Sequence, residues 1–266
     1  MEPIPFAEGA AEGAPGDGRR AELFPSNGLL YDSYLAAPRQ SRMSVKIQLP
    51  VGGSDRNRKI ENTLGLHRPI ARWPSADDPT GGTEVQFEAA VFARFDMEEH
   101  WDMDASDWRF GIPVVFREGD LAWKIHLYHL TSHLGDEHIE RTGRDAIAYH
   151  LEEAAFGLSW DVSDGSRLYG EAGVAVYTSR ETDNGRFQVG YEWVGSRAAT
   201  GFSPYFAVDL QARNDQDWTP GKTAAAGIAY GTHVRFGLEY YHGRDTQTQF
   251  MQDRAEYISV GLAIDF

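Results

Sequence analysis

The chain has 266 residues, and its 25 basic against 40 acidic side chains give a formal charge of −15, which disfavours binding to the phosphates of nucleic acid. It contains no cysteine, so disulfides, thiolate metal sites and a cysteine nucleophile are excluded. No run of about 18 apolar residues occurs, which excludes helical membrane spans, while 12% aromatic residues and 28 glycines favour an all-β class.

The start of the chain differs in composition from the rest. Residues 1–21 are small, acidic and rich in proline and glycine, a composition that predicts a disordered leader. The leader lacks the basic and apolar stretches of a signal peptide, so we expect either a cytoplasmic chain or a processed form given a new methionine. Residues 22–42 form a separate segment before the regular pattern begins.

From residue 43 onward the apolar residues recur with a period of two. Successive side chains of a β-strand point to opposite faces, so this alternation gives each segment one apolar and one polar face. The clearest segments are 43–49, 84–96, 108–116, 121–131, 187–193, 202–212, 234–240 and 258–266. Weaker ones cover 60–72, 146–160, 167–178 and 222–231. Together they predict about twelve antiparallel strands, most of them near the ~10 residues that a tilted strand needs to cross a bilayer.

The connections decide between a soluble barrel with an apolar interior and a membrane barrel with an apolar exterior. Three connections are tight and turn-prone, with the sequences REGD, DVSDGS and GT. They alternate with longer polar loops: MEEHWDMDASD, HLGDEHIERTGRD, SRETDNG, RNDQDWTPGK and HGRDTQTQFMQDR. Although the long stretch WPSADDPTGG falls on the short side, this layout is typical of an antiparallel transmembrane β-barrel of the bacterial outer membrane, here over residues 43–266. The alternative is a soluble lipocalin-like binding protein.

The last segment carries the most specific signal. Its alternating apolar face ends at an aromatic residue where the chain stops, and consists of Ile258, Val260, Leu262, Ile264 and Phe266. Such a strand resembles the signal that the outer-membrane barrel-insertion machinery reads, so we expect this machinery and membrane lipids as partners. Ahead of the first strand, the apolar residues at 29–31 are expected to pack at the periplasmic mouth of the barrel.

Several blocks of sequence resemble an uncharacterised family of bacterial outer-membrane proteins, the domain of unknown function 1207. The blocks are LFP near Leu23, YLAAPRQSRMS at 34–44, FREGDLAWKIHLYHLTSHLGDE at 116–137 and QF at 249–250. The resemblance covers residues 22–266, and YHLTSHLGDE is its most specific part. It implies a barrel fold and an outer-membrane location, and it supplies no activity.

The same block is similar, more faintly, to the outer-membrane phospholipase A and lipid A deacylase families. Their motifs have His, any residue and then Ser near the outer end of a strand. The matching positions here are His129, Leu130 and Thr131, so threonine occupies the nucleophile position. Ser132 occupies the position of the Asn that follows in those families. The resemblance implies a lipid-acting hydrolase with His129 as its base, with these two departures from the motif.

The spacing of His129 and Thr131 suits proton transfer between them. Residues i and i+2 of a strand lie on one face roughly 6.8 Å apart, and this face carries the apolar residues that would meet lipid. A general base needs an orienting partner, which His150 or Glu152 on the neighbouring strand could supply. The alternative is that these groups lie solvated among lipid headgroups and have a structural role.

The acidic connections offer ligands for a hard cation. Asp136 and Glu137 follow the turn after the strand that carries His129. Further acids lie in another loop, at Glu98, Glu99, Asp102 and Asp104. Because Ca²⁺ takes carboxylate oxygens, these loops could hold it or bridge it to lipid phosphates; the alternative is a solvated acidic loop. Zinc is disfavoured, since His129 and His133 on a strand would be about 13 Å apart.

The polar faces of the strands would point into the lumen with charges of both signs. They carry Glu88, Arg94, Arg109, Arg117, Lys124, His126, Tyr128, Glu171, Glu192, Asp209, Gln211, Arg235 and Glu239. Mixed signs favour a cross-linked, filled interior over an open pore, although a narrow wet path is sterically possible. Two functions stay open: a structural envelope barrel or narrow small-solute channel, and a lipid-acting hydrolase that uses His129 with Thr131 or Ser132.

Overall fold

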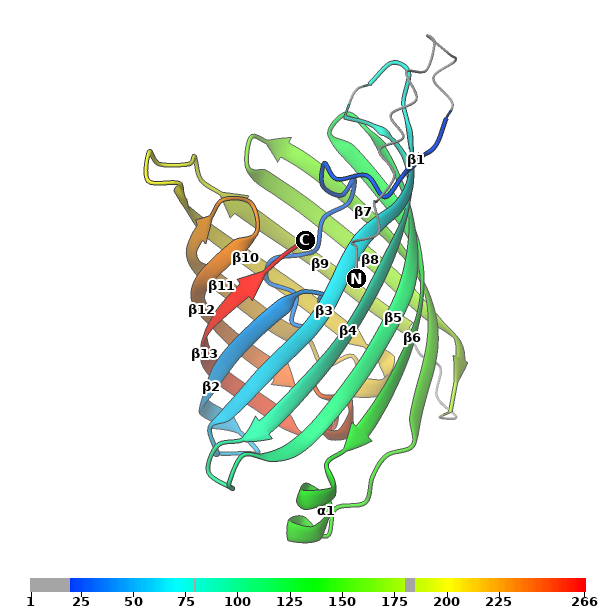
Figure 1. Ribbon diagram of the computed structural model, residues 1–266. Helices are drawn as coiled ribbons and strands as arrows, with labels where there is room; N and C mark the ends of the chain where they lie inside the picture. The colour runs from blue at the N-terminus through cyan, green and yellow to red at the C-terminus, as the bar shows by residue number, and fades with distance from the viewer. Residues whose placement is uncertain (1–19, 79, 180–184) are drawn as a thin grey trace, which may run out of the picture.

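Twelve long antiparallel strands account for most of the residues that the computed structural model describes, which are 20–78, 80–179 and 185–266 (Figure 1). They are β2 (Met43–Gly53), β3 (Lys59–Pro74), β4 (Gly82–Asp96), β5 (Asp102–Glu118), β6 (Leu121–Leu134), β7 (Tyr149–Ser163), β8 (Ser166–Thr178), β9 (Gly185–Val194), β10 (Phe202–Arg213), β11 (Gly221–Tyr230), β12 (Val234–Arg244) and β13 (Arg254–Ile264). Each strand pairs with its neighbours in chain order, and β13 pairs with β2, so the sheet closes into a barrel. The prediction of about twelve strands is confirmed.

Four short elements complete the described chain. They are β1 (Glu22–Leu23), α1 (Asp136–Thr142), and the 3-10 turns η1 (Asn214–Gln216) and η2 (Thr248–Phe250). None of the helices in the described ranges has the length and apolar character needed to cross a membrane. The predicted leader, residues 1–21, lies almost wholly outside the described residues.

One predicted loop is wrong in its extent. The stretch MEEHWDMDASD ends as strand, because β5 begins at Asp102. The acidic residues of this stretch are typical of a loop, yet Asp104 and Asp107 point into the barrel. There they form ion pairs with Lys59 and Arg39, respectively. A strand that faces a charged lumen can therefore be as polar as a loop.

The barrel is apolar outside and polar inside. On β6 the outward Leu127 is 57% exposed, whereas His126 and Tyr128 on either side of it are 3% and 7% exposed. Inside, opposite charges pair across the lumen, as Lys46 and Glu239 do at 2.7 Å. This orientation is that of a membrane barrel, since a lipocalin-like soluble barrel would turn its apolar faces inward.

The two ends of the barrel differ in their connections. The short-turn rim carries β1, the C-terminal end of β13 and the connections 75–81, 119–120, 164–165, 195–201 and 231–233. The long-loop rim carries 54–58, 97–101, 135–148, 214–220, 245–253 and the connection between β8 and β9. The longest of these contains α1, which closely follows the strand that carries His129.

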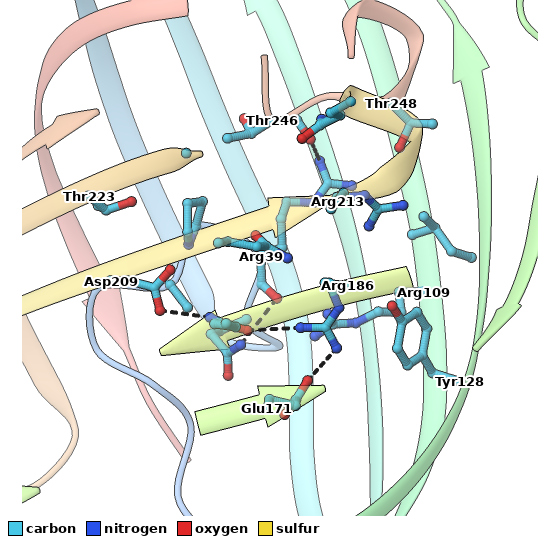
Figure 2. A pocket seen from close by; sticks show the side chains of 18 of the residues that line it. Arg39, Arg109, Tyr128, Glu171, Arg186, Asp209, Arg213, Thr223, Thr246 and Thr248 are labelled. Carbon is cyan, nitrogen blue, oxygen red and sulfur yellow. Dashed lines mark hydrogen bonds and ion pairs between the residues drawn. The ribbon is translucent and has the colours of Figure 1, made fainter. Parts of the chain in front are cut away.

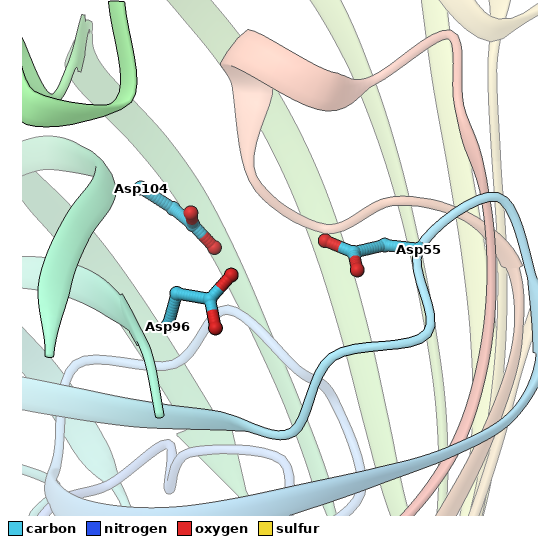
Figure 3. A group of neighbouring side chains, drawn as sticks. All are labelled: Asp55, Asp96 and Asp104. Atoms are coloured by element: carbon cyan, nitrogen blue, oxygen red, sulfur yellow. The ribbon is translucent and has the colours of Figure 1, made fainter. Parts of the chain in front are cut away.

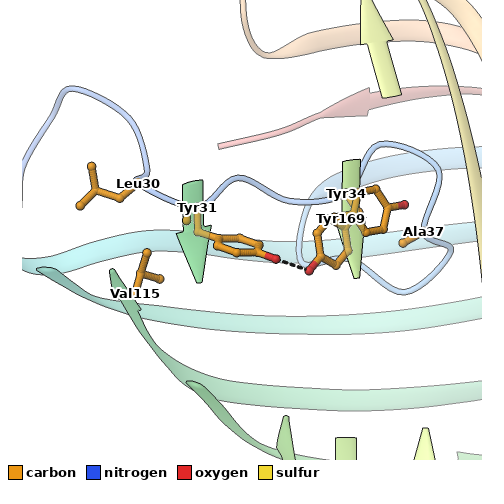
Figure 4. Packing of buried hydrophobic residues seen from close by; sticks show 7 residues of the cluster. Leu30, Tyr31, Tyr34, Ala37, Val115 and Tyr169 are labelled. Carbon is orange, nitrogen blue, oxygen red and sulfur yellow. Dashed lines mark hydrogen bonds between the residues drawn. The ribbon is translucent and has the colours of Figure 1, made fainter. Parts of the chain in front are cut away.

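Residues 24–42, called the plug below, join β1 to β2 and run inside the barrel from Leu30 onward (Figure 1). Their buried side chains pack on the inner wall in the cluster Leu30, Tyr31, Tyr34, Ala37, Val115, Ala122 and Tyr169 (Figure 4). Tyr34 stacks on Tyr169 with ring centroids 3.8 Å apart, and its hydroxyl lies 2.6 Å from that of Tyr31. Burial raises the pKa of both plug tyrosines, so they act as neutral hydrogen-bonding groups. Leu30 and Tyr31 cluster with Val115 and Ala122 close to the short turn 119–120, at the mouth where the sequence places residues 29–31, and the plug then continues deeper to Arg39 at Asp107.

A second segment enters the lumen from the long-loop rim. Residues 245–253, called the latch below, join β12 to β13 and include η2. Gln247, Gln249 and Met251 of the latch are at most 2% exposed. Plug and latch therefore fill the lumen from opposite ends.

Candidate functional site

His129 and Thr131 lie on the outer face of β6, in line with the exposed Leu127. In the register of β6 and β7, His129 is opposite Glu152 and Thr131 is opposite His150. Directly opposite residues of an antiparallel pair share one face. The period-two pattern thus brings all four side chains together on the outer wall, near the long-loop rim.

Glu152 is the partner that His129 contacts. Its Oε1 lies 2.6 Å from Nδ1 of His129, within hydrogen-bond distance. With Nδ1 donating to the carboxylate, Nε2 is left as the acceptor of a proton. The ring of Phe110 flanks the imidazole with centroids 5.0 Å apart. The site therefore holds a histidine fixed by a carboxylate beside an aromatic ring.

The strand geometry next to Glu152 is irregular. The pairing of β7 with β8 shifts register between Glu152 and Glu153, which is a β-bulge. Bulges re-aim side chains and are frequent beside active sites. The His129–Glu152 side chains are 25% and 48% exposed, so the pair adds at most about 1 kcal/mol to stability. The contact therefore contributes little to the stability of the barrel.

The other predicted catalytic residues are arranged differently. Thr131 shares the outer face, but within the described chain no hydrogen bond joins it to His129. His150 is exposed, and its backbone N–H donates to Ser179 Oγ at 2.9 Å. Ser132 points into the lumen, where it donates to Asp107 and accepts from Gln249, and it cannot face His129.

The first two predicted calcium ligands, Asp136 and Glu137, do not converge with other acids in the described residues. Asp136 and Glu137 lie exposed in the first turn of α1. The loop acids are engaged with arginines, Glu98 with Arg58 and Asp102 with Arg141. Among the described residues, Asp136 and Glu137 take no part in a cluster of carboxylates that could hold a cation.

A different group of acids does converge at the long-loop rim: Asp55, Asp96 and Asp104 (Figure 3). The ammonium of Lys59 lies 2.8, 2.6 and 2.9 Å from their respective carboxylates. Burial alone would raise the pKa of Asp55, but Lys59 and the backbone N–H of Asn57 hold that pKa below its ordinary value. A lysine therefore occupies the centre that a cation would take. Sequence reasoning named Asp104 as a candidate ligand but missed Asp55, Asp96 and the lysine between them.

The lumen contains a cavity of about 90 Å³ between plug and latch (Figure 2). Its charged lining consists of Arg39, Arg109, Lys124, Arg186, Arg213, Glu88, Glu171, Asp209 and Asp245. Most of these charges are paired: Arg186 donates to Glu171, and Lys124 lies 2.9 Å from the same carboxylate. The mixed signs expected from the sequence thus form a cross-linked interior.

Residues 18–266 match the family described as a protein of unknown function, DUF1207. The chain belongs to this family. A search of curated proteins finds no significant match. The family match covers the whole barrel, and it confirms the resemblance seen in the YHLTSHLGDE block.

Solved outer-membrane barrels share the fold. The outer-membrane phospholipase A of Escherichia coli is 11% identical with a TM-score of 0.59, covering 86% of this chain and 94% of that chain. The Salmonella typhi outer-membrane phospholipase dimer with bound calcium is 10% identical, with a TM-score of 0.60 and coverages of 88% and 94%. KdgM porin is 5% identical, with a TM-score of 0.50 and coverages of 85% and 99%. At such identities these likenesses show an outer-membrane type of barrel and no activity.

Proposed function

We propose that this DUF1207 protein resides in the bacterial outer membrane and hydrolyses acyl esters of membrane lipids on its outer wall. The observation that carries the proposal is the 2.6 Å contact between His129 Nδ1 and Glu152 Oε1 on the face that meets lipid. A base oriented by a carboxylate is the arrangement that activates a hydroxyl nucleophile. The position on the outer face suits a substrate dissolved in the bilayer.

The reaction follows from the groups available. His129 Nε2 accepts the proton of the Thr131 hydroxyl while Oγ1 attacks the ester carbonyl carbon. The imidazolium, stabilised by Glu152, returns that proton to the departing alcohol, which leaves an acyl-threonine. Water, deprotonated by the same imidazole, then releases the fatty acid and restores Thr131. Apo geometry is often looser than that of the substrate complex, so a rotation of Thr131 completes the site.

The surroundings support a substrate with acyl chains. Trp108 lies opposite Thr131 on β5 and is 51% exposed, and Phe110 lies opposite His129 with 53% exposure. On β8, Tyr177 lies opposite Glu152 and is 61% exposed. These rings offer an apolar surface on either side of the polar groups.

The test measures fatty-acid release from phospholipid and from lipid A in mixed micelles containing Ca²⁺. Wild type should release fatty acid, and His129→Ala and the isosteric Thr131→Val should each reduce the rate by about 10²-fold or more. His133→Ala is the matched control, since His133 is outward on the same strand and has no carboxylate partner in the described chain. A wild type that releases no fatty acid, or an equal loss in His133→Ala, would overturn the proposal.

A further inference from the structure

We propose that the lumen is a gated passage for ions and small hydrophilic solutes, and that plug and latch are two gates interlocked at Asp107. This inference concerns the inside of the barrel and is independent of the outward site. It rests on three features: a shared anchor at Asp107, hydrogen bonds that hold the plug to the wall, and a charged cavity behind the plug.

Asp107 is the shared anchor. It lies on β5, points inward and has no exposed surface. One of its oxygens accepts from the Arg39 guanidinium of the plug. The same oxygen accepts from the backbone N–H and Oγ1 of Thr248 in the latch, at 3.0 and 2.7 Å. Its other oxygen accepts from Ser132 on β6. A single carboxylate therefore joins both gates to the wall.

Arg39 reinforces the junction from the plug side. Its Nη1 donates to the backbone carbonyl of Thr246 at 2.7 Å, which is a second direct contact between plug and latch. Its guanidinium also lies 4.2 Å from the ring centroid of Phe92 on the wall. Because Arg39 touches wall and latch together, moving the plug tip must disturb the latch. This shared contact is the physical basis of the interlock.

Besides its apolar and aromatic packing, the plug is held to the wall by hydrogen bonds. The backbone N–H groups of Leu30 and Leu35 donate to Glu84 and Glu192 on the wall, at 3.0 and 2.9 Å. Tyr34 donates its hydroxyl to Glu171 at 3.1 Å. Water can replace such hydrogen bonds at a net cost of about 1 kcal/mol each, whereas a strand cannot leave the barrel without opening its ladder. The plug is thus the part of the lumen that can move while the barrel stays closed.

The cavity behind the junction defines what could pass. It is lined by cations and anions in nearly equal number, with Arg109 and Lys124 facing Glu88 and Glu171. A volume of about 90 Å³ holds several waters but no large ligand. Release of the plug would join this cavity to the short-turn rim. The balanced charges predict a narrow passage with weak selectivity between cations and anions.

Single-channel recording in planar bilayers tests the gate. Wild type should be closed for most of the time, and Arg39→Gln should make openings at least about tenfold more frequent, because it weakens the anchor at Asp107 and Thr246. Arg213→Gln is the matched control: it removes one positive charge from the same cavity, where Arg213 pairs with Asp215 of η1 and touches neither gate. The control should behave as wild type.

A thiol probe tests plug movement and the interlock in the same folded protein. The chain has no cysteine, so Ala37→Cys introduces a single thiol at a plug position that is 4% exposed. A water-soluble maleimide should label it slowly, and about tenfold faster when Arg39→Gln is added. Thr248→Val, a change in the latch alone, should also speed labelling of the plug. Heat-modifiable migration on gels verifies that each variant keeps its barrel.

Each outcome supports or overturns one part of the proposal. More frequent openings together with faster labelling support the proposal. Unchanged conductance with unchanged labelling in Arg39→Gln overturns the gate, and equal opening in Arg213→Gln overturns the assignment to Asp107. Labelling of the plug that ignores Thr248→Val overturns the interlock. Fatty-acid release by these variants should match wild type, so a failure of the hydrolase proposal remains distinguishable.

Discussion

Glu152 decides how His129 behaves, because its carboxylate fixes the tautomer and orientation of the imidazole. Glu152→Gln keeps a hydrogen-bonding oxygen but removes the negative charge. We expect fatty-acid release to fall by about 10²- to 10⁴-fold, since the imidazolium that forms during the reaction loses its stabilising partner. The rate in mixed micelles measures this effect. His150→Ala serves as the control and should retain near wild-type rate; if it loses as much as Glu152→Gln, the assigned partner is wrong.

For single residues, the sequence predicts the strand face on which a side chain lies better than it predicts the residues that the side chain contacts. The period of two correctly puts His129 and Thr131 on one outward face, and strand pairing brings Glu152 within reach. The alternative nucleophile Ser132 is wrong, because it faces the lumen, where its partner Gln249 lies 117 positions away in the sequence. Lys59 likewise gathers three acids from one loop and two strands. Such contacts form only when the barrel closes, so they cannot be predicted from a pattern of neighbouring residues.

Elements pack closely where the plug leaves the lumen to become β2. A Cβ added to Gly65 of β3 would lie 2.6 Å from the backbone nitrogen of Arg42 and 2.7 Å from its carbonyl oxygen. Gly65→Ala should therefore cost about 1–3 kcal/mol and expose the plug to protease. Denaturant unfolding in detergent and limited proteolysis measure both effects. Gly170→Ala is the control, because its Cβ would meet nothing closer than 3.7 Å; equal destabilisation there would rule out this explanation.

Asp265 ties the end of the plug to the end of β13. Burial alone would raise the pKa of its carboxyl, but the guanidinium groups of Arg42 and Arg235 hold that pKa below its ordinary value of 3.8. A lowered folded-state pKa gives stability that is present above pH 4 or so and is lost as the pH falls through the lower value. Asp265→Asn should lower the free energy of unfolding by about 1–3 kcal/mol between pH 5 and 8.

Unfolding of wild type and Asp265→Asn across a pH series measures this difference. It should stay constant from pH 8 to 5 and shrink below about pH 4, where the wild-type carboxyl becomes protonated. A difference that grows on acidification would contradict the assigned ion pairs. Arg254→Gln is a suitable control, since this exposed arginine follows the latch and no side-chain partner of it is found in the described residues.

The strands could be predicted from the sequence, whereas the path of the plug through the lumen could not. Each strand is recognisable from the alternation of apolar and polar residues along it. Leu30 and Leu35 of the plug, by contrast, donate to carboxylates 54 and 157 positions away in the sequence. The start of β5 was hidden for a related reason. The acidic residues Asp104 and Asp107 suggest a loop in the sequence. Their place in a strand is explained only by Lys59 and Arg39, which face them in the lumen.

The whole molecule is closed by strands from the two ends of the chain, with β13 beside β2. Phe266 ends the chain, and the Arg68 guanidinium lies 5.1 Å from the centroid of its ring. We propose that the final strand is read by the insertion machinery, so Phe266→Ala should slow assembly into vesicles that contain this machinery by several-fold. The stability of the assembled barrel should change by about 1 kcal/mol or less. The rate at which the heat-modifiable form appears measures assembly.

Arg68→Gln separates recognition from packing at this position. It removes the cation above the ring and leaves the aromatic residue in place. Assembly at the wild-type rate is expected for this variant. If Arg68→Gln delays assembly as much as Phe266→Ala does, the ring acts through packing in the finished barrel and not as a signal.

The outward direction of His129 has a kinetic consequence. In the hydrolase proposed above the substrate reaches this wall from the bilayer, so the rate of encounter is set by the mole fraction of substrate in the membrane and not by its bulk molarity. Diluting the substrate with an inert lipid should slow turnover even when the total substrate is constant. An inhibitor should likewise gain potency in proportion to its partitioning into lipid.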